Sequence, residues 1–428
     1  MLIFGFVGTV LIVTGLVHLY LWKRLVRDTT RPGRGRLLGS LGMLALALVI
    51  PAAIVGSRTG AEWLAWPGYL WLAVMFYLLV LLLLLEVPML VARLWLRRRA
   101  RAAAAVAVPE PALVGGAPPP SAPPAEGAGP VEVTSQAAPT KAAGRAPEPG
   151  HDPGRRLLLA RGAAIFAGLA AVGVTGYGVR TAFAAPEVER VQIPIRRLGR
   201  GADGLRIALV SDIHLGPMLG RAHTERIVAT INRLDPDIVA VVGDLVDGTV
   251  AELGPAAAPL ADLRARHGSF FVTGNHEYYS GYEEWVEEVH RLGLRPLRNE
   301  RVQIVHNGAA LDLAGVNDVN GEEFGDGPDF AKALGDRDPA NPVVLLAHQP
   351  VVAPQAARYG VDLQLSGHTH GGQMVPFNLL VGAAQPLVSG LGTIDGTTVY
   401  VTTGAGFWGP PVRVGVPPEV TLIELRTA

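Results

Sequence analysis

Side chains of the types that can bind divalent cations follow five short apolar segments in the C-terminal half of this 428-residue chain. Each segment is rich in leucine or β-branched residues and has the length of a β-strand. Sites in open α/β sheets form beyond the carboxyl ends of the strands, so we expect these side chains to converge. In chain order they are Asp212, His214, Asp244, Asn275, His276, His348, His368 and His370.

The types of these side chains indicate a metal-dependent reaction. Carboxylate oxygens, amide oxygens and imidazole nitrogens bind hard or borderline divalent cations. The chain has no cysteine, which excludes thiolate ligands, disulfides and cysteine nucleophiles. One carboxylate can bridge two cations, and two cations roughly 3.5–4 Å apart can hold a hydroxide and bind a phosphate. Glycines beside the candidates let the backbone approach such cations closely, namely Gly243, Gly274, Gly367, Gly371 and Gly372.

The elements that must position these residues are strands that alternate at first with helices. Amphipathic helices are predicted over Ala222–Leu234 and Tyr282–Leu292, whereas the later strands lack clear intervening helices. This order predicts an α/β sandwich with a mixed sheet. The predicted strands are Leu205–Val210, Ile238–Val242, Phe270–Val272, Val343–Ala347, Leu363–Leu365, Val399–Val401 and Val420–Leu425.

The complete motif series resembles the calcineurin-like metallophosphoesterase superfamily, over about residues 186–428. The ending Gly371-Gly372-Gln373 and the late segment Gly415–Val420 are similar to its membrane-associated or exported bacterial branch, the YkuE- and YaeI-like phosphoesterases. The resemblance implies a metallophosphoesterase-type β-sandwich flanked by helices. The motifs that carry it are Asp212-x-His214, Gly243-Asp244, Gly274-Asn275-His276-Glu277, His348 and Gly367-His368-Thr369-His370.

The resemblance also implies a role for each residue. Asp244 bridges two divalent cations (Mn, Fe, Zn or Mg), and a hydroxide held between them attacks the phosphate. His276 lies beside the phosphate, where it stabilises the transition state or protonates the leaving oxygen. One cation is held by Asp212, His214 and His370, and the other by Asn275, His348 and His368.

Neighbouring acidic residues have less specific signals. Asp247 either orients a metal ligand or forms a turn with the glycine that follows it, and Glu277 is expected to be structural. Asn317 and Asp318 follow a short apolar run and could reach substrate. The acidic, glycine-rich segment Asn317–Phe330 is then either a solvated loop or a loop that gates the site.

Arg413 is a candidate phosphate ligand, because it lies near Phe407 and Trp408 in an apolar segment that could contact lipid. The alternative for that segment is ordinary loop packing. The remaining histidines of this half have no partners in the sequence and are predicted to be surface residues, namely His223, His267, His290 and His306.

The N-terminal part predicts membrane helices. Residues 1–101 contain three apolar runs long enough to span a bilayer, Leu2–Leu21, Leu37–Val55 and Tyr69–Ala92. Residues 102–154 are rich in Ala, Pro and Gly and are predicted to be a disordered linker. Residues 155–185 form a fourth transmembrane helix or, because of Arg155 and Arg156, a signal-like anchor of the twin-arginine type.

Charge predicts the orientation of the chain. Arginines cluster before the second run, after the third and before the fourth, so these flanks are cytoplasmic and residues 186–428 lie outside the cytoplasm. The spans contain no evident charge pair; His18 and Glu86 are expected to lie near the run ends, so the spans are predicted to be an anchor. Residues 1–185 carry a net charge of +10 (18 basic, 8 acidic), and residues 186–428 carry a net charge of −10 (19 basic, 29 acidic). The negative charge of the C-terminal half argues against a nucleic-acid partner.

The function predicted from these observations is hydrolysis of a phosphomonoester, phosphodiester or pyrophosphate by a multi-pass protein of the cell membrane. Tethering favours a lipid-linked or envelope-related substrate. Two alternatives remain: a pyrophosphatase of the UDP-diacylglucosamine type, which requires a cytoplasmic site, and a non-catalytic metal-binding sensor or scaffold. The oligomeric state has no signal in the sequence.

Overall fold

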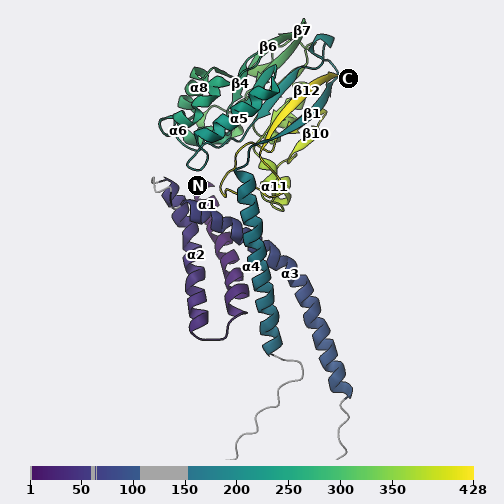
Figure 1. Ribbon diagram of the computed structural model, residues 1–428. Helices are drawn as coiled ribbons and strands as arrows, with labels where there is room; N and C mark the ends of the chain where they lie inside the picture. Colours follow the sequence, from purple (N-terminus) through teal and green to yellow (C-terminus); the bar gives the residue numbers. More distant parts are fainter. Residues whose placement is uncertain (1, 59–62, 64, 107–152) are drawn as a thin grey trace, which may run out of the picture.

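The described part of the chain consists of four long helices and a C-terminal α/β domain (Figure 1). The computed structural model describes residues 2–58, 63, 65–106 and 153–428. The helix α3 continues to Val106 and α4 begins at Pro153, so both ends of the predicted linker are helical. The rest of that linker, residues 107–152, lies outside the described residues.

The N-terminal helices run alternately toward and away from the domain. Figure 1 shows the end of α3 and the start of α4 at the far end of the bundle, while α4 leads directly into the domain. Within the described residues, three helical stretches are long and apolar enough to cross a membrane, over residues 34–53, 65–92 and 157–182. The elements are α1 (Leu2–Leu21), the π-helical turn η1 (Trp22–Arg27), α2 (Arg34–Arg58), α3 (Ala65–Val106) and α4 (Pro153–Ala182).

The bundle contains a partly buried ion pair, which joins a residue directly after the first predicted span to one near the end of the third. The Nε atom of Arg24 in η1 lies 3.0 Å from Oε1 of Glu86 in α3, and the Arg24 side chain is almost fully buried. The hydroxyl of Tyr20 donates to the same Glu86 oxygen. The sequence does not reveal this pair because its members lie 62 positions apart and meet only when α1 packs against α3.

Two six-stranded sheets form the body of the domain. In the first, β2, β3 and β4 are parallel, and in the second β7, β8, β9 and β11 are parallel. The first sheet has the order β1 (Glu187–Ile195), β12 (Glu419–Thr427), β2 (Arg206–Val210), β3 (Ile238–Val242), β4 (Ser269–Val272), β5 (Leu294–Pro296). The second has the order β10 (Gly390–Ile394), β11 (Thr397–Val401), β9 (Leu363–Ser366), β8 (Val343–Leu346), β7 (Ala309–Gly315), β6 (Glu300–His306).

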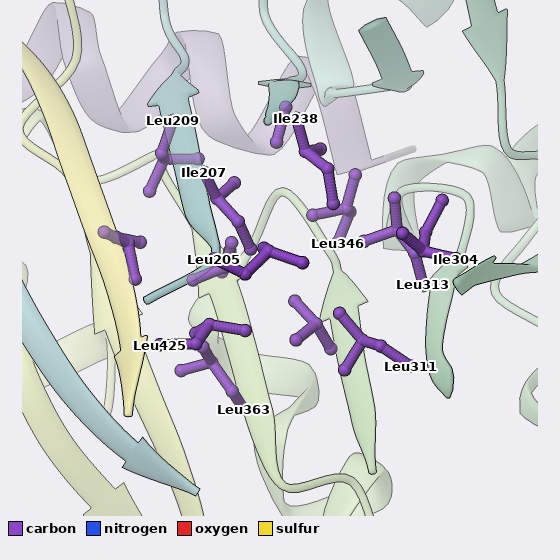
Figure 2. Close-up of a cluster of buried hydrophobic side chains, with 14 of the residues drawn as sticks. Leu205, Ile207, Leu209, Ile238, Ile304, Leu311, Leu313, Leu346, Leu363 and Leu425 are labelled. Atoms are coloured by element: carbon purple, nitrogen blue, oxygen red, sulfur yellow. The ribbon is translucent and has the colours of Figure 1, made fainter. Parts of the chain in front are cut away.

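The core lies between the two sheets, where apolar side chains from both meet (Figure 2). Successive side chains of a strand point to opposite faces. Ile207 and Leu209 of β2 therefore point into this core beside Leu346 and Leu363 of the second sheet, whereas Ala208 packs on the outer face of the first sheet. The prediction of a sandwich is confirmed, with two mixed sheets.

Helices cover the outer faces of both sheets. Trp285 of α8 and Ile227 of α5 are fully buried in the apolar cluster on the first sheet, and Phe330 of α9 is buried on the second. The predicted strands and both predicted helices are present. The helices are α5 (Arg221–Leu234), α6 (Val250–Ala257), α7 (Asn275–Ser280), α8 (Tyr282–Arg291), α9 (Phe330–Leu334), α10 (Ala353–Arg358) and α11 (Asn378–Ala384).

His223 of α5 is buried, which corrects its prediction as a surface residue. It is 2% exposed, its Nδ1 accepts from Arg226, and its Nε2 has no hydrogen-bond partner among the described residues. His306 is also buried, with its Nδ1 2.9 Å from Nε2 of His267. Burial and the charges of Arg226 and Arg413 lower the pKa of His223 to about 4.

We expect the buried His223 to make the fold sensitive to acid. The unfolded chain takes up this proton near pH 6.5 and the folded chain only near pH 4. The contribution of neutral His223 to the free energy of unfolding is therefore fully present above about pH 6.5 and is lost as the pH falls toward 4. His223→Gln should lose less thermal stability than the wild type between pH 7 and pH 5, measured as Tm in detergent. His290→Gln, on the exposed face of α8, should behave as the wild type, and equal losses in all three proteins would contradict the assignment.

Candidate metal centre

The carboxyl ends of strands from both sheets meet at one edge of the sandwich, and the predicted ligands lie there. The amide of Asp212, after β2, donates to the carbonyl of Gly243 after β3. The amide of His368, after β9, donates to both carboxylate oxygens of Asp212. A side chain at Gly367 would overlap Ser211 and the Asp212 carboxylate, so only glycine permits this approach of the two sheets.

One group of possible ligand atoms comes from Asp212, His214 and His370, which the sequence assigned to one cation. The Nε2 atoms of the two histidines lie 3.1 Å apart, and Nε2 of His370 lies 3.3 Å from Oδ1 of Asp212. The Nδ1 of His214 donates to the carboxylate of Asp247, which leaves the Nε2 lone pair free to bind a cation. These three side chains are buried and could hold a metal ion.

A second group consists of Asp244, His348 and His368. The Nδ1 of His348 donates to the carbonyl of Val242, so its Nε2 lone pair faces the centre. This buried Nε2 has no hydrogen-bond partner in the described residues and lies 3.2 Å from Oδ2 of Asp244. The Oδ1 of Asn275 lies 3.0 Å from Nδ1 of His368, which brings the amide into the same group.

Five of the predicted ligands occupy the left-handed region of backbone conformation. Their φ angles are 53° for Asp212, 50° for His214, 51° for Asp244, 71° for His368 and 51° for His370. Side chains other than glycine adopt this region at a cost of about 1–3 kcal/mol each, and such residues cluster at functional sites. Together with the unpartnered histidine nitrogen, this strain indicates that the loops are shaped to present ligands to a cation.

Burial favours the neutral, metal-binding form of two candidate ligands, His368 and His370, whereas the charges of Asp244 and Asp212 outweigh burial and raise the pKa of His348. Burial, together with nearby positive charge, lowers the pKa of His368 to about 3. Burial and the neighbouring His214 and Arg413 hold the pKa of His370 well below its ordinary value. Neutral imidazole is the ligand form of histidine, so the residues present fit divalent cations.

His276 lies at the edge of the centre and has a different environment. Its Nδ1 lies 2.5 Å from Oδ1 of Asp247, and its amide donates to Oδ1 of Asp244. Burial opposes protonation, but the hydrogen bond to Asp247 and the charge of Asp244 raise the pKa of His276 to about 9. The imidazole is therefore a cationic proton donor near neutral pH in the protein without bound metal.

Asp247 orients two histidines, which resolves the two interpretations left open by the sequence. The same carboxylate oxygen contacts the Nδ1 atoms of His214 and His276. Glu277 is structural, as predicted: its buried carboxylate accepts from the amides of Asp244, Leu245 and Gly274 and so joins the ends of β3 and β4. In the sequence, the only indication of a role for Asp247 and Glu277 is that both lie close to the metal-binding motifs.

Asn317 and Asp318 are both buried and belong to a well-packed loop. The side-chain Nδ2 of Asn317 donates to the carbonyl of Asp326, and Oδ1 of Asp318 accepts from the Gln349 side chain. The second oxygen of Asp318 has no hydrogen-bond partner among the described residues, and burial raises the pKa of this carboxyl to about 6. Their role as substrate ligands stays a prediction.

Arg413 is fully buried, which favours ordinary loop packing at this position, and its role as a phosphate ligand stays a prediction. Its guanidinium donates to the carbonyls of Gly406 and Thr403 and lies 3.3 Å from Nδ1 of His370. Its backbone amide donates to the carbonyl of Gly178 in α4. The sequence could not separate these roles because the contacts depend on how the loop folds back over the centre.

We expect Arg413→Lys to weaken metal binding. A lysine ammonium lacks the planar fork that joins two loop carbonyls to His370, so the ligand should lose its fixed position. Mutation of a residue that supports a metal ligand typically lowers the metal affinity by about 10- to 100-fold. Titration of the purified chain with Mn²⁺ measures this affinity, with Arg221→Lys on the exposed face of α5 as the control. An unchanged affinity would show that Arg413 supports only the loop.

Comparisons with known proteins agree with this geometry. A model of the family described as calcineurin-like phosphoesterase matches residues 205–372, which include every predicted metal ligand. A Danio rerio protein described as a transmembrane protein with metallophosphoesterase domain is 42% identical over 262 residues. That match covers 59% of this chain and 60% of the relative, so the chain spans less than two thirds of the length of this relative.

Two bacterial relatives match over more of their own length. An uncharacterized metallophosphoesterase of Helicobacter pylori is 38% identical over 260 residues, covering 60% of this chain and 68% of the relative. The uncharacterized metallophosphoesterase YkuE of Bacillus subtilis is 29% identical over 283 residues, covering 61% of this chain and 95% of the relative.

Proposed function

The chain belongs to the calcineurin-like phosphoesterases, which are metal-dependent phosphoester hydrolases, and from this premise we propose that it uses two divalent cations to hydrolyse a phosphate ester at a membrane. The observation that carries the two-metal proposal is the position of Asp244. Its Oδ2 lies 3.2 Å from Nε2 of His348 in one ligand group and 3.7 Å from Nε2 of His214 in the other. A carboxylate between two groups is suited to bridge two cations.

Each residue has a distinct part in this proposal. Asp212, His214 and His370 would hold one cation, Asn275, His348 and His368 would hold the other, and Asp244 would bind both. When bound, divalent cations polarise phosphoryl oxygens and lower the pKa of a water molecule. His276, fixed by Asp247, donates a proton or a charge-assisted hydrogen bond to the developing oxyanion of the leaving group.

The proposed substrate is lipid-linked or part of the cell envelope, and two observations support this. The indole ring of Trp408 lies 6.0 Å from the ring of His276 and is 58% exposed, so an aromatic surface borders the centre. The preceding Phe407 packs on Phe183, which stacks on Trp66 beside the membrane helices. The centre is thus connected to the junction between the domain and the bundle.

The proposed location of the domain is outside the cytoplasm. The arginine-rich flanks lie at the end of the bundle away from the domain (Figure 1), and positive flanks are retained in the cytoplasm. A reporter active only in the cytoplasm, fused after Ala428, should give no signal, whereas one active only outside should give a strong one. The opposite pattern would favour the UDP-diacylglucosamine type of pyrophosphatase, whose substrate is cytoplasmic.

The test of the activity uses the full chain purified in detergent. We expect hydrolysis of bis-p-nitrophenyl phosphate or p-nitrophenyl phosphate that stops with a chelator and returns with Mn²⁺. Asp212→Asn should remove this activity, while Asp395→Asn, also at a positive φ but exposed, should retain it. A folded, metal-loaded chain that hydrolyses neither these esters nor lipid-linked phosphates and pyrophosphates would favour the sensor or scaffold alternative.

A further inference from the structure

We propose that the α11 patch, defined as Val375, Phe377, Leu379 and Leu380, inserts into the surface layer of the bilayer that the N-terminal helices span. The proposal rests on the membrane placement proposed above and is independent of hydrolysis. The occupant of the patch is lipid. The domain is thereby attached to the membrane at a second point besides α4.

The α11 patch is unusually apolar for a protein surface. Leu379 is 73% exposed, Leu380 65%, Phe377 42% and Val375 40%, and α11 has no buried residue. The surrounding segment 374–394 contains no acidic or basic residue, although the domain as a whole is acidic. Contiguous exposed apolar surface of this kind marks a contact with a partner or a membrane.

The patch is continuous with the packing of the domain on the bundle. Met374, directly before it, lies in one apolar cluster with Leu78 and Leu82 of α3 and Ala171 of α4. The ring of Phe377 meets that of Phe76 in α3 edge-on, with centroids 6.1 Å apart. Figure 1 shows α11 at the base of the domain beside α4, so its exposed face lies where the surroundings of the bundle begin.

The aromatic residues of the bundle indicate the level of the bilayer surface. Trp63 and Trp66 are exposed at the domain end of α3, as in the aromatic belt at a membrane interface. Because Phe377 packs against Phe76 in the apolar stretch of α3 that follows Trp66, the patch lies on the bilayer side of the belt, where lipid and not water surrounds an exposed leucine.

Insertion of the patch would set the height of the metal centre above the bilayer. The chain runs from His370 to the patch in a few residues, and the Gln373 side chain between them is hydrogen-bonded to the backbone of Trp408. Trp408 in turn borders His276. A phosphate at the level of the lipid headgroups is therefore the substrate class that this placement favours.

The absence of cysteine allows a direct test, because a single introduced cysteine carries the only label. The full chain is labelled with an environment-sensitive fluorophore at Leu380→Cys, at Leu84→Cys in the apolar part of α3, and at Val305→Cys in β6 on the domain. All three native side chains are exposed in the protein, at 65%, 66% and 57%. The chains are placed in nanodiscs with and without brominated lipid, and then exposed to aqueous iodide.

We expect brominated lipid to quench the labels at residues 380 and 84 and to shift their emission to shorter wavelength, while iodide quenches only the label at residue 305. Quenching of the label at residue 84 without quenching of the label at residue 380 would overturn the proposal for the patch but not the membrane placement of the bundle. The absence of quenching at 84 would overturn the membrane placement as well. A label at 380 that is protected from iodide but insensitive to brominated lipid would show a protein partner on the patch and would also overturn it.

Discussion

His276→Ala is expected to lower kcat by about 100- to 10,000-fold while both metals stay bound, the range for a positioned proton donor or charge stabiliser. Among the described residues, the imidazole shares a possible ligand group with His214 and Asp247 but not with the two groups that contain Asp212 and Asp244, and its Nδ1 contacts Asp247. Its loss therefore removes a group that acts on the reacting phosphate and leaves the ligand sets intact. Steady-state kinetics with p-nitrophenyl esters, together with metal analysis of the same samples, measures both effects.

The pH dependence separates this role from a structural one. Asp247 and Asp244 raise the pKa of His276 to about 9, so the protonated form is present at neutral pH and is lost as the pH rises. The wild type should show a fall in kcat/KM at or below pH 9, because bound cations disfavour the imidazolium, and the variant should lack it. His290→Ala, at an exposed position, is the matched control. Equal pH profiles for the wild type and His276→Ala would exclude a proton-donating role.

Asp244→Asn is expected to lower kcat/KM on the order of 1,000-fold or more, because a bridging carboxylate contributes to both cations. Asparagine keeps the shape of the side chain and the acceptor for the His276 amide, so the loop should remain folded. It lacks the negative charge that faces His348 and His214. The metal content after gel filtration should fall at both positions.

The control for this substitution is Asp262→Asn, at an exposed position far from the motifs, which should keep wild-type activity and metal content. Loss of only one metal from Asp244→Asn would indicate that the carboxylate serves a single cation. Retention of both metals and of activity would contradict the proposed centre.

The arrangement around Arg413 also bears on how the bundle and the centre are related. The backbone of this residue is bonded to α4 and its side chain to the loop that presents His370. The C-terminal part of α4 is therefore packed against the part of the domain that shapes one candidate ligand group.

The sequence by itself determined the candidate ligands and most of the strands that carry them. Each ligand follows its strand within a few residues, as Asp212 follows β2 and His348 follows β8. The parallel strands then bring these ends to one edge, which is a local consequence of strand direction. The edge strand β1 was missed because its exposed charged residues, such as Glu189 and Arg190, hide its apolar pattern.

The tertiary structure determined which residues contact and support those candidate ligands. Asp247 contacts His276, which lies 29 positions away in the chain. Arg413 contacts His370, which lies 43 positions away. The burial of His223, the ion pair of Glu86 and the exposure of the α11 patch likewise depend on which elements pack together. The sequence records the residue types, but burial and pairing are properties of surfaces that exist only after the sheets, the helices and the bundle have assembled.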